Sequence, residues 1–376
     1  LIKDQNQALQ NTLDSQQGLI VQQNALIDAL ALSSGITLPW IVSEVDGSAN
    51  AGGCASLAYG PDGSSAIAYF DTAARSLRLA RLVNGSWSLE TVDTDGQMGE
   101  LFGQGRSCSI AFTAEGQPAI AYFDEGSGNE RLKYAEFDGS SWQIEDLGEP
   151  GSEMSLAFSP AGHPAISFHH FNDQDLRIAE HDGMSWQITT VDDSGSSQGQ
   201  FNSLAFGPDG HPAISSFSLT SGDLRFARFD GSSWNLEGVD TTDTVGRYTS
   251  LAFSPSGQPA ISYERVTGSF LRYAEYDGSA WQIDDVNGNF ESGQFTSLAF
   301  NPTGQPSIAY FNGSNGTLHF TARDASLWRD ETLESTFNTG QSASLAISPS
   351  GQPAIAYLGS DGQTIRFAER KPFTQP

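Results

Sequence analysis

One serine-centred phrase recurs through this chain and constrains the fold more than any other feature. Its fifth copy is SLAFSPSGQPAISYERVTGSFLRYAEYDGSAW, which begins at Ser250 and ends at Trp281. The first serine of the phrase returns at intervals of 53, 46, 48, 47, 47 and 47 residues. These serines are Ser56, Ser109, Ser155, Ser203, Ser250, Ser297 and Ser344. Seven copies of one unit at a nearly constant period predict a repeat architecture.

Each copy contains four short runs with the composition of β-strands. In the fifth copy these runs are residues 250–254, 259–263, 271–276 and 281–286. The residues between them are rich in Gly, Pro, Asp and Ser, which is typical of tight turns. We therefore expect each copy to form one small, four-stranded antiparallel sheet.

The first two runs alternate large and small side chains, which predicts how the sheets pack. Leu251 and Ile261 lie on one face, whereas Ser250 and Ser262 lie on the other. A sheet with one bulky and one hollow face is suited to stack on copies of itself. Radial stacking gives a β-propeller, whose blades are four-stranded. An open solenoid also buries both faces, but it needs atypical capping repeats at its ends.

The two ends of the repeat array favour a closed ring. Every tryptophan of the chain begins a fourth run: Trp40, Trp87, Trp142, Trp186, Trp234, Trp281 and Trp328. The last copy has no tryptophan after its third run, whereas residues 40–46 precede the first copy and are similar to a fourth run. We therefore predict an all-β fold, a seven-bladed propeller of four-stranded antiparallel blades over residues 40–376. The N-terminal strand 40–46 completes the last blade, which resembles the closure of many propeller families.

Residues 1–34 differ in kind, because they contain no proline, one glycine and a heptad pattern. The pattern predicts an α-helical coiled-coil stalk, joined to the propeller by a linker at residues 35–39. Its core positions are Ile2, Asn6, Leu9, Leu13, Gln16, Ile20, Gln23, Ile27 and Leu30. In a parallel oligomer the amides can pair across the axis and fix the register. We expect the chain to associate with itself through this helix, as a trimer in preference to a dimer, rather than to fold the helix back, since isolated helices are unstable in water.

Blade topology gives the predicted propeller two different faces. The turns between strands one and two and between strands three and four lie on one face, together with both ends of the propeller chain. The stalk therefore attaches to this short-turn face. The loops between strands two and three and the connections between blades lie on the other face, which we call the outward face.

Sequence variation between the copies is concentrated in the loops of the outward face, and this layout is typical of a binding surface. The alternative is that these loops vary because nothing constrains them. Aromatic rings in such loops can stack on sugars. The candidate ligand-binding residues are Phe102, Arg106, Phe123, Asp124, His169, His170, Phe201, Arg247 and Phe290.

The two cysteines, Cys54 and Cys108, occupy nearly equivalent places in adjacent copies. The innermost strands of neighbouring blades converge on the axis, so a disulfide between them is geometrically feasible. The alternative is a pair of buried free thiols. A disulfide would place the protein outside the reducing cytosol.

Metal-binding signals in the sequence are weak. Asp93 and Asp95 are similar to part of a calcium loop, but the remaining ligands and the terminal glutamate are missing. His169 and His170 stand near Asp173 and Asp175, and we expect these histidines to be solvated loop residues rather than metal ligands. No cofactor is therefore expected, and calcium is the remaining alternative.

The acidic composition excludes one class of partner. With 45 acidic and 18 basic residues, the net charge is −27. Nucleic-acid binding needs a basic surface, so it is not expected. High acidity suits a soluble, secreted or cell-surface repeat protein, and we predict an extracellular or cell-surface location. The chain has no run of 18 apolar residues, so no membrane span is expected.

Catalytic motifs are not evident. Residues 195–199 match G-x-S-x-G but lack the strand–turn–helix context that the motif needs. The turns at residues 138–142 and 230–234, both DGSSW, resemble the Asp-box of sialidase-type propellers with a spacing shorter by one residue. The marks of WD40 and kelch repeats are absent.

The repeat phrase and its turns resemble those of the degenerate repeat propellers of bacterial secreted and surface proteins. That resemblance implies a lectin or a part of a fibre. We predict a non-enzymatic, extracellular binding head of the adhesin or fibre-tip type, which presents its outward face to glycans or to a surface partner. The alternatives are a structural subunit of an extracellular filament and, third, a glycosidase or lyase with its site in the axial cleft.

Overall fold

The computed structural model describes most of the repeat region. The described residues are 38–48, 51–94, 108–124, 131–195, 197–286 and 292–370, together with the isolated residues 16, 19 and 23. The predicted coiled coil of residues 1–34 and most of the linker 35–39 lie outside the described residues and stay predictions. Among the residues that are described, no helix has the length and apolar character that a membrane span requires.

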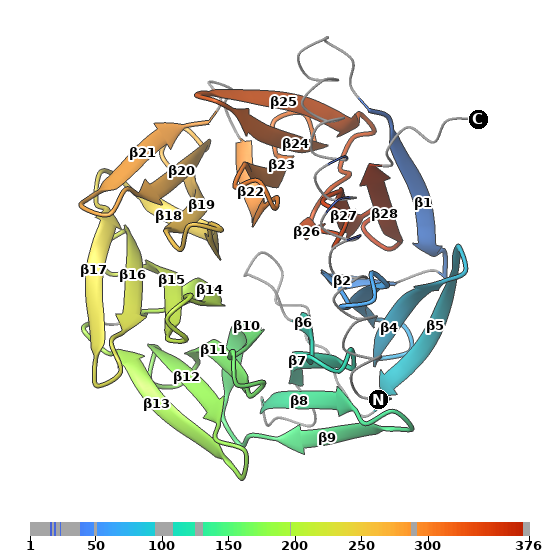
Figure 1. The fold of residues 1–376 in the computed structure, drawn as a ribbon, viewed down its shortest axis with the longest axis horizontal. Coiled ribbons are helices and arrows are strands. Elements are labelled where there is room, and N and C mark those ends of the chain that lie inside the picture. The colour runs from blue at the N-terminus through green and yellow to red at the C-terminus, as the bar shows by residue number, and fades with distance from the viewer. Residues whose placement is uncertain are drawn as a thin grey trace.

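The described chain forms seven four-stranded antiparallel sheets arranged around a common axis (Figure 1). Blade 1 contains β2 (Ala51–Tyr59), β3 (Ser65–Asp71), β4 (Ser76–Val83) and β5 (Ser86–Asp93). Blade 2 contains β6 (Cys108–Phe112), β7 (Pro118–Asp124), β8 (Arg131–Phe137) and β9 (Trp142–Asp146). Blade 3 contains β10 (Gly151–Phe158), β11 (Pro164–His170), β12 (Asp175–His181) and β13 (Trp186–Asp192).

The second half of the ring repeats this plan. Blade 4 contains β14 (Gln200–Phe206), β15 (Pro212–Ser218), β16 (Asp223–Phe229) and β17 (Trp234–Asp240). Blade 5 contains β18 (Val245–Phe253), β19 (Pro259–Arg265), β20 (Phe270–Tyr276) and β21 (Trp281–Asp285). Blade 6 contains β22 (Ser292–Phe300), β23 (Pro306–Asn312), β24 (Thr317–Asp324) and β25 (Leu327–Glu334). Blade 7 contains β26 (Ser344–Ile347), β27 (Pro353–Leu358), β28 (Ile365–Arg370) and β1 (Trp40–Asp46).

The N-terminal strand closes the ring, as the sequence predicts. β1 is the outermost strand of blade 7 and pairs antiparallel with β28, with Trp40 opposite Arg370 (Figure 1). The Trp40 ring packs edge-on against Phe320 of blade 6 at 5.1 Å between centroids. The Arg370 guanidinium lies 4.7 Å from the centroid of the Trp40 ring. The seven-bladed propeller of four-stranded antiparallel blades is therefore confirmed.

Both faces of the inner strands are buried, which the alternation of large and small residues predicts. In blade 5, Leu251 pairs with Ile261 and Ser250 pairs with Ser262. All four side chains are buried. Bulk on one face and hollows on the other thus let each sheet pack against both of its neighbours.

The seven repeat serines form a closed circuit of hydrogen bonds between blades. Each hydroxyl accepts the backbone N–H of the residue that follows the repeat serine in the next blade, at 2.9 to 3.1 Å. Ser56 accepts from Ile110, and Ser344 accepts from Leu57, which joins the last blade to the first. The sequence identifies these serines only as small residues. Their recurrence has a chemical reason, because each one satisfies a buried N–H of its neighbour.

Removal of one serine hydroxyl is expected to destabilise the whole ring. Ser344→Ala leaves the N–H of Leu57 buried without its partner, so we expect a loss of about 1–3 kcal/mol in the free energy of unfolding. Ser203→Ala should cost a similar amount, because its hydroxyl makes the same bond to Leu251. Urea titration measures both. The control is Ser326→Ala in an exposed turn, and the idea fails if Ser344→Ala and this control have the same stability.

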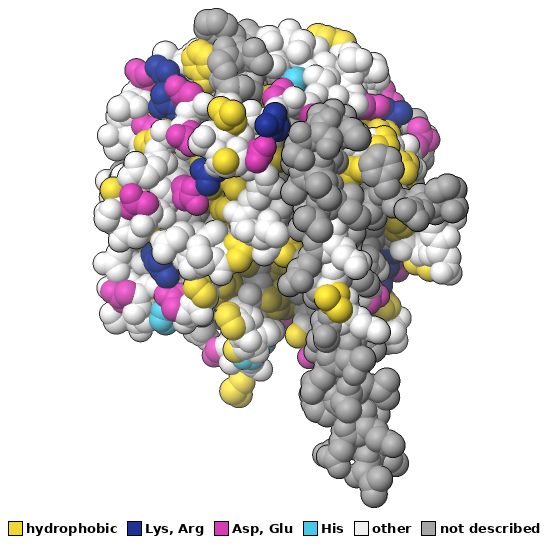
Figure 2. Space-filling view, turned by 45° about the horizontal axis from the view of Figure 1, so that its top comes forward, with side chains coloured by type: hydrophobic (Ala, Val, Ile, Leu, Met, Phe, Trp, Pro, Cys, Tyr) yellow, Lys and Arg dark blue, Asp and Glu magenta, His cyan; other side chains and the backbone are white. Residues whose placement is uncertain are grey.

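Charged side chains of both signs are interspersed on the face that Figure 2 shows. Among the described residues, ion pairs form across strands or blades, such as Arg272 with Asp240 at 2.8 Å and Arg323 with Glu275 at 2.6 Å. Local pairing therefore offsets the charge of some acidic side chains, while the net charge of the chain stays at −27. No single basic patch is visible on this face.

Candidate functional site

A small pocket lies on the outward half of the propeller axis, between the first strands of blades 2 to 6. Its walls leave a cavity of about 40 Å³, which has room for a few water molecules. We call it the axial pocket. Its lining residues are Ser109, Glu153, Met154, Ser155, Phe201, Asn202, Ser203, Tyr248, Thr249, Phe295 and Thr296.

A repeated backbone irregularity brings side chains to this pocket. The residue two positions before the repeat serine has a φ between 51° and 54° in blades 3 to 7. These residues are Glu153, Phe201, Tyr248, Phe295 and Ser342. In blades 3 to 6 the strand register shifts at this position, which marks a bulge. Bulges re-aim side chains, and positive φ at residues other than glycine is uncommon outside turns and functional sites.

Three of these residues form a row of aromatic rings. The Tyr248 ring lies 4.7 Å from the Phe201 ring and 4.7 Å from the Phe295 ring, between centroids. Phe201 is buried, whereas Tyr248 and Phe295 are half-buried. The row therefore gives the axial pocket a partly accessible aromatic wall. Such a wall can pack on an apolar ligand face.

Glu153 places an ionisable group in the same pocket. The residue is 5% exposed, and its carboxylate accepts the backbone N–H of Phe201. Burial raises the pKa of Glu153 to about 7, and the hydrogen bond from Phe201 opposes part of that shift. No lysine, arginine or histidine forms an ion pair with it within the described residues. Glu153 therefore gains or loses its charge near neutral pH, as functional carboxylates often do.

The surroundings of Glu153 are held by further polar contacts. Asn202 donates its amide to the carbonyl oxygens of Glu153 and Gly199 and accepts the Ser167 hydroxyl at 2.5 Å. Burial, with the nearby carboxylates of Glu264 and Glu153, raises the pKa of Tyr248 to about 12. The Tyr248 hydroxyl is therefore protonated at neutral pH and acts as a hydrogen-bond group.

One of the predicted ligand-binding residues lines this pocket, and a second is the chain neighbour of a lining residue. Phe201 is part of the aromatic row, and Arg247 immediately precedes Tyr248. The Arg247 guanidinium lies 5.8 Å from the centroid of the Phe217 ring, and Arg247 pairs across the strands with Glu264. Burial raises the pKa of Glu264 to about 7, against the attraction of Arg247.

Two other predicted ligand-binding residues are buried in blade 2 instead. Phe123 is 2% exposed and belongs to β7, and Asp124 ends that strand. The Asp124 carboxylate lies 2.5 Å from the Lys133 ammonium. The expectation that both residues belong to an outward loop is therefore wrong. Phe102, Arg106 and Phe290 lie outside the described residues.

The expectation that His169 and His170 are solvated loop residues is also wrong. Both belong to the end of β11 and are 4% and 5% exposed. Burial lowers the pKa of His169 to about 4, so this ring is neutral at physiological pH. Its Nε2 atom is buried without a hydrogen-bond partner.

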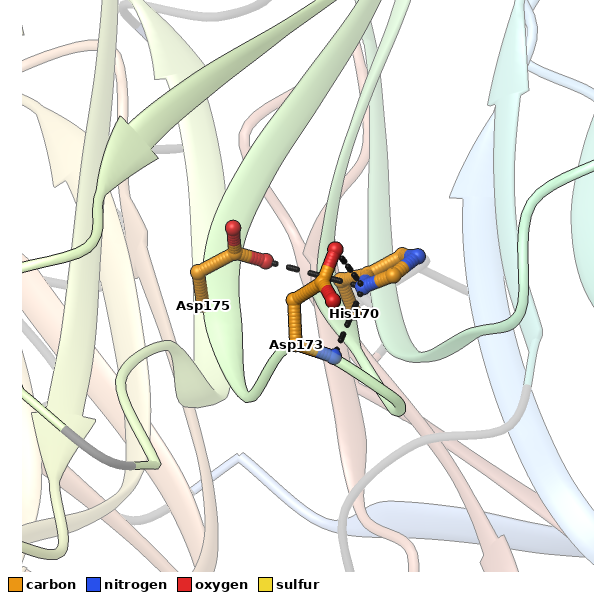
Figure 3. Close-up of side chains that lie close together, drawn as sticks. All are labelled: His170, Asp173 and Asp175. Carbon is orange, nitrogen blue, oxygen red and sulfur yellow. Dashed lines mark hydrogen bonds and ion pairs between the residues drawn. The ribbon is translucent and has the colours of Figure 1, made fainter.

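His170, Asp173 and Asp175 converge on the outward side of blade 3 (Figure 3). The His170 Nδ1 atom accepts the N–H of Asp173 at 3.1 Å, and its Nε2 atom lies 3.3 Å from the Glu149 carboxylate. The three potential ligand atoms lie within 4.8 Å of one another. Geometry alone would thus permit a metal ion.

Arg177 already forms ion pairs with the carboxylates of this cluster. Its guanidinium pairs with Glu149 at 2.9 Å, with Asp175 at 3.2 Å and also with Asp173. A cation would have to displace this arginine from three carboxylates. The contacts therefore favour an ion-pair network that fixes the loop between β11 and β12.

Asp93, the other predicted metal ligand, is engaged between blades. It is 9% exposed, accepts the Tyr122 hydroxyl at 2.5 Å and lies 3.3 Å from the Lys133 ammonium. Asp46 accepts Tyr69, and Asp240 accepts Tyr263, in the same way. These contacts favour a structural role over calcium ligation, because the same aspartate–tyrosine hydrogen bond recurs between neighbouring blades. Asp95 lies outside the described residues.

Cys54 and Cys108 are joined by a disulfide, with 6.0 Å between their Cα atoms. The bond links β2 to β6, the innermost strands of blades 1 and 2. The sequence leaves open a disulfide or two buried free thiols, and the structure contains the disulfide. Cys54 occupies the position that Glu153 and Tyr248 hold in their blades, so blade 1 uses it for a cross-link.

Sequence reasoning missed Glu153, Tyr248, Phe295 and Asn202. A signal for the first three is present, because the position two before the repeat serine varies strongly within an otherwise constant phrase. From blade 1 to blade 7 it is Cys, Ser, Glu, Phe, Tyr, Phe and Ser. The side chains at this position in blades 3 to 6 line the axial pocket.

Comparison with known proteins identifies the fold but no family. No protein-family model matches the chain, and no curated protein matches it. An ulvan lyase of polysaccharide lyase family PL25, bound to a GlcA–Rha3S saccharide, aligns with a TM-score of 0.61 and 13% identity over 87% of this chain and 95% of that chain. An inactive variant of virginiamycin B lyase from Staphylococcus aureus aligns with a TM-score of 0.57 and 10% identity, over 88% and 99% of the two chains.

A lectin has a similar fold as well. Aleuria aurantia lectin, in complex with α-methyl-L-fucoside, aligns with a TM-score of 0.50 and 14% identity, over 78% of this chain and 97% of that chain. Identities this low carry the architecture and not the activity. The chain is thus similar in fold to enzymes and to a lectin alike, and the comparisons establish a β-propeller.

Proposed function

We propose that this protein is a non-enzymatic, extracellular binding head that binds the end of a glycan at the mouth of the axial pocket, against its partly accessible aromatic wall. The observation that carries the proposal is the meeting of Glu153 with the aromatic row of Phe201, Tyr248 and Phe295 on the outward face. An apolar wall with a few convergent polar groups is the usual composition of a small-ligand site.

The chemistry of the pocket suits a sugar. The C–H face of a pyranose ring packs on aromatic rings, and its hydroxyls need groups that both donate and accept hydrogen bonds. With its pKa raised to about 7, Glu153 supplies a carboxylic acid below neutral pH and a carboxylate above it. The protonated hydroxyl of Tyr248 adds a second group of this kind.

Further features support an extracellular head that acts as a multimer. The disulfide between Cys54 and Cys108 is suited to an oxidising compartment. Self-association through the predicted coiled coil of residues 1–34 would present several axial pockets together. Weak sites then combine into strong binding, because a second site binds at high effective concentration.

An enzyme of the lyase or glycosidase type is the second candidate. It is favoured by the raised pKa of Glu153, which suits a general base near neutral pH. We rank it lower because the carboxylate of Glu153 bonds to a backbone N–H. Its neighbour Tyr248, with a pKa raised to about 12, is a weak proton-transfer partner at pH 7.

A glycan array probed with the full chain tests the binding proposal. Tyr248→Leu and Phe295→Leu keep apolar volume but remove the flat rings, so we expect each to weaken binding of the strongest glycan about tenfold. The matched control is Phe337→Leu, because Phe337 is an outward aromatic residue that is 72% exposed. Its affinity should equal that of the wild type.

Two results would contradict the proposal. One is the absence of glycan binding by the folded oligomer, or equal binding by all four proteins. The other is turnover: release of shortened or unsaturated sugars from a bound polysaccharide, abolished by Glu153→Gln, would establish the enzyme instead.

A further inference from the structure

A second and larger pocket lies between blades 4 and 5, near the short-turn face. Its volume is about 570 Å³, within the range of small-molecule sites. We call it the inter-blade groove. His211, Phe226, Arg228 and Glu237 line it from blade 4, and Tyr276 and Trp281 line it from blade 5. None of these residues belongs to the axial pocket.

The aromatic wall of the groove is held in a fixed orientation. The Trp281 ring packs edge-on against Phe226 at 5.1 Å and lies 5.6 Å from the Tyr276 ring, between centroids. Its Nε1 atom donates a hydrogen bond to Glu237 at 2.9 Å. Tyr276 and Trp281 thus form a rigid corner of two rings, which needs little ordering when a ligand binds.

Equivalent places at two other blade interfaces are filled by charged side chains. Between blades 1 and 2, the Arg81 guanidinium lies 4.9 Å over the ring of Phe137, which corresponds to Tyr276. Between blades 5 and 6, Glu275 corresponds to Arg228 and pairs with Arg323 at 2.6 Å. In both cases the protein itself occupies the space between the third strands.

Between blades 4 and 5 the equivalent side chain, Arg228, is held away from the Tyr276 ring. Arg228 pairs with Asp209 at 2.8 Å, and its guanidinium lies 5.6 Å from the centroid of the Phe253 ring. Within the described residues, no lysine or arginine lies over Tyr276. The groove therefore stays open in front of the aromatic corner because Asp209 retains Arg228.

From these contacts we propose that the inter-blade groove binds a neutral saccharide. The corner of Tyr276 and Trp281 offers two ring faces or edges to a pyranose. Within the described part of the chain, the Tyr276 hydroxyl and the ring nitrogens of His211 have no hydrogen-bond partner, so they are available to sugar hydroxyls. Asp209, Asp230 and Glu237 outweigh Arg228 at the groove, and this excess of negative charge disfavours acidic sugars.

This site is separate from the function proposed above, because it lies toward the opposite face of the propeller. A protein with both sites would hold one glycan on the outward face and another near the short-turn face, where the stalk is predicted to attach. It would thereby cross-link two carbohydrate surfaces or two parts of one matrix.

Titration calorimetry on the full chain tests the inference, with cellotriose, maltotriose, xylotriose and chitotriose as neutral probes. Sialyllactose and trigalacturonate are the acidic probes. We expect His211→Ala and Tyr276→Ala to weaken the tightest neutral probe about tenfold, the loss that one well-packed contact residue typically causes. His163→Ala is the matched control, since His163 holds the same turn position in blade 3 and does not line the groove.

The outcomes separate this site from the axial pocket. Tyr248→Leu should leave the affinity for the neutral probe unchanged. If only this variant loses affinity, the probe binds in the axial pocket and not in the groove. Binding of no neutral probe, tighter binding of the acidic probes, or equal losses in His211→Ala and His163→Ala would overturn the inference. If Tyr276→Ala fails to fold, Tyr276→Phe, which removes only the hydroxyl, is expected to weaken binding by a smaller factor.

Discussion

Replacement of residues 40–46 by a glycine–serine sequence of equal length is expected to remove at least about 5 kcal/mol from the free energy of unfolding, which is a large part of the total for a typical domain. The replacement leaves the edge of β28 without its partner strand. It also removes Trp40 from Phe320 and Arg370, and Val45 from the core between blades 7 and 1. Large-to-small changes of this kind cost several kcal/mol each.

Loss of the closing strand also removes a link to the next blade. Asp46 accepts the buried Tyr69 hydroxyl at 2.6 Å, so Tyr69 would lose its partner. Urea unfolding, followed by tryptophan fluorescence and by circular dichroism, measures the effect. Ile41→Ser is the control, because Ile41 is 46% exposed on the same strand. If the replaced protein and this control unfold at the same midpoint, the closure does not stabilise the ring.

Glu153→Gln is expected to make the protein more stable above neutral pH and to leave it unchanged in acid. The folded-state pKa is raised from 4.5 to about 7 by burial. Below pH 4.5 the carboxyl is protonated in both the folded and the unfolded state, so it costs nothing. Between about pH 4.5 and 7 the unfolded state releases the proton first, so wild-type stability falls as the pH rises.

The size of this effect follows from the shift. A difference of 2.5 pH units between 4.5 and about 7 corresponds to about 3 kcal/mol. Above pH 7 the glutamine variant should exceed the wild type by up to that amount. Urea titrations at pH 4.5, 6 and 8 measure the difference, and Glu115→Gln, in an exposed turn, is expected to follow the wild-type curve. A constant difference between Glu153→Gln and the wild type at all three pH values would refute the buried ionisation.

The architecture could be predicted because it depends on patterns that repeat. Seven serines, seven tryptophans and one displaced fourth strand give the blade number and the closure. These features are set by local strand pairing and by alternation of side-chain size, which leave a direct trace in the order of residues.

The predicted end of the second strand lies too early in blades 2, 3 and 5. The sequence places its end in blade 5 at Tyr263, whereas β19 continues to Arg265. The second strands of blades 3 and 2 are longer by the same two residues. These residues are His169 and His170 in blade 3, and Phe123 and Asp124 in blade 2, and all four are buried. Polar residues at a strand end look like loop residues in sequence, because partners from other strands supply their burial.

The axial pocket could not be predicted for a different reason. Glu153 and Tyr248 reach it because their backbone adopts a positive φ at a bulge. Neither glutamate nor tyrosine is a residue type from which a positive φ would be predicted. The rings of Phe201, Tyr248 and Phe295 come from three different blades. Their meeting depends on the closed ring and not on any local stretch of sequence.

The serine circuit bears on how such a ring can change its size during evolution. Each junction uses the same hydroxyl and the same N–H, so a gene that gained or lost one whole copy would regenerate every bond of this kind. These hydrogen bonds can therefore form in a ring with any number of copies. The number of blades therefore depends on other contacts between neighbouring sheets, such as the packing of large side chains against small ones.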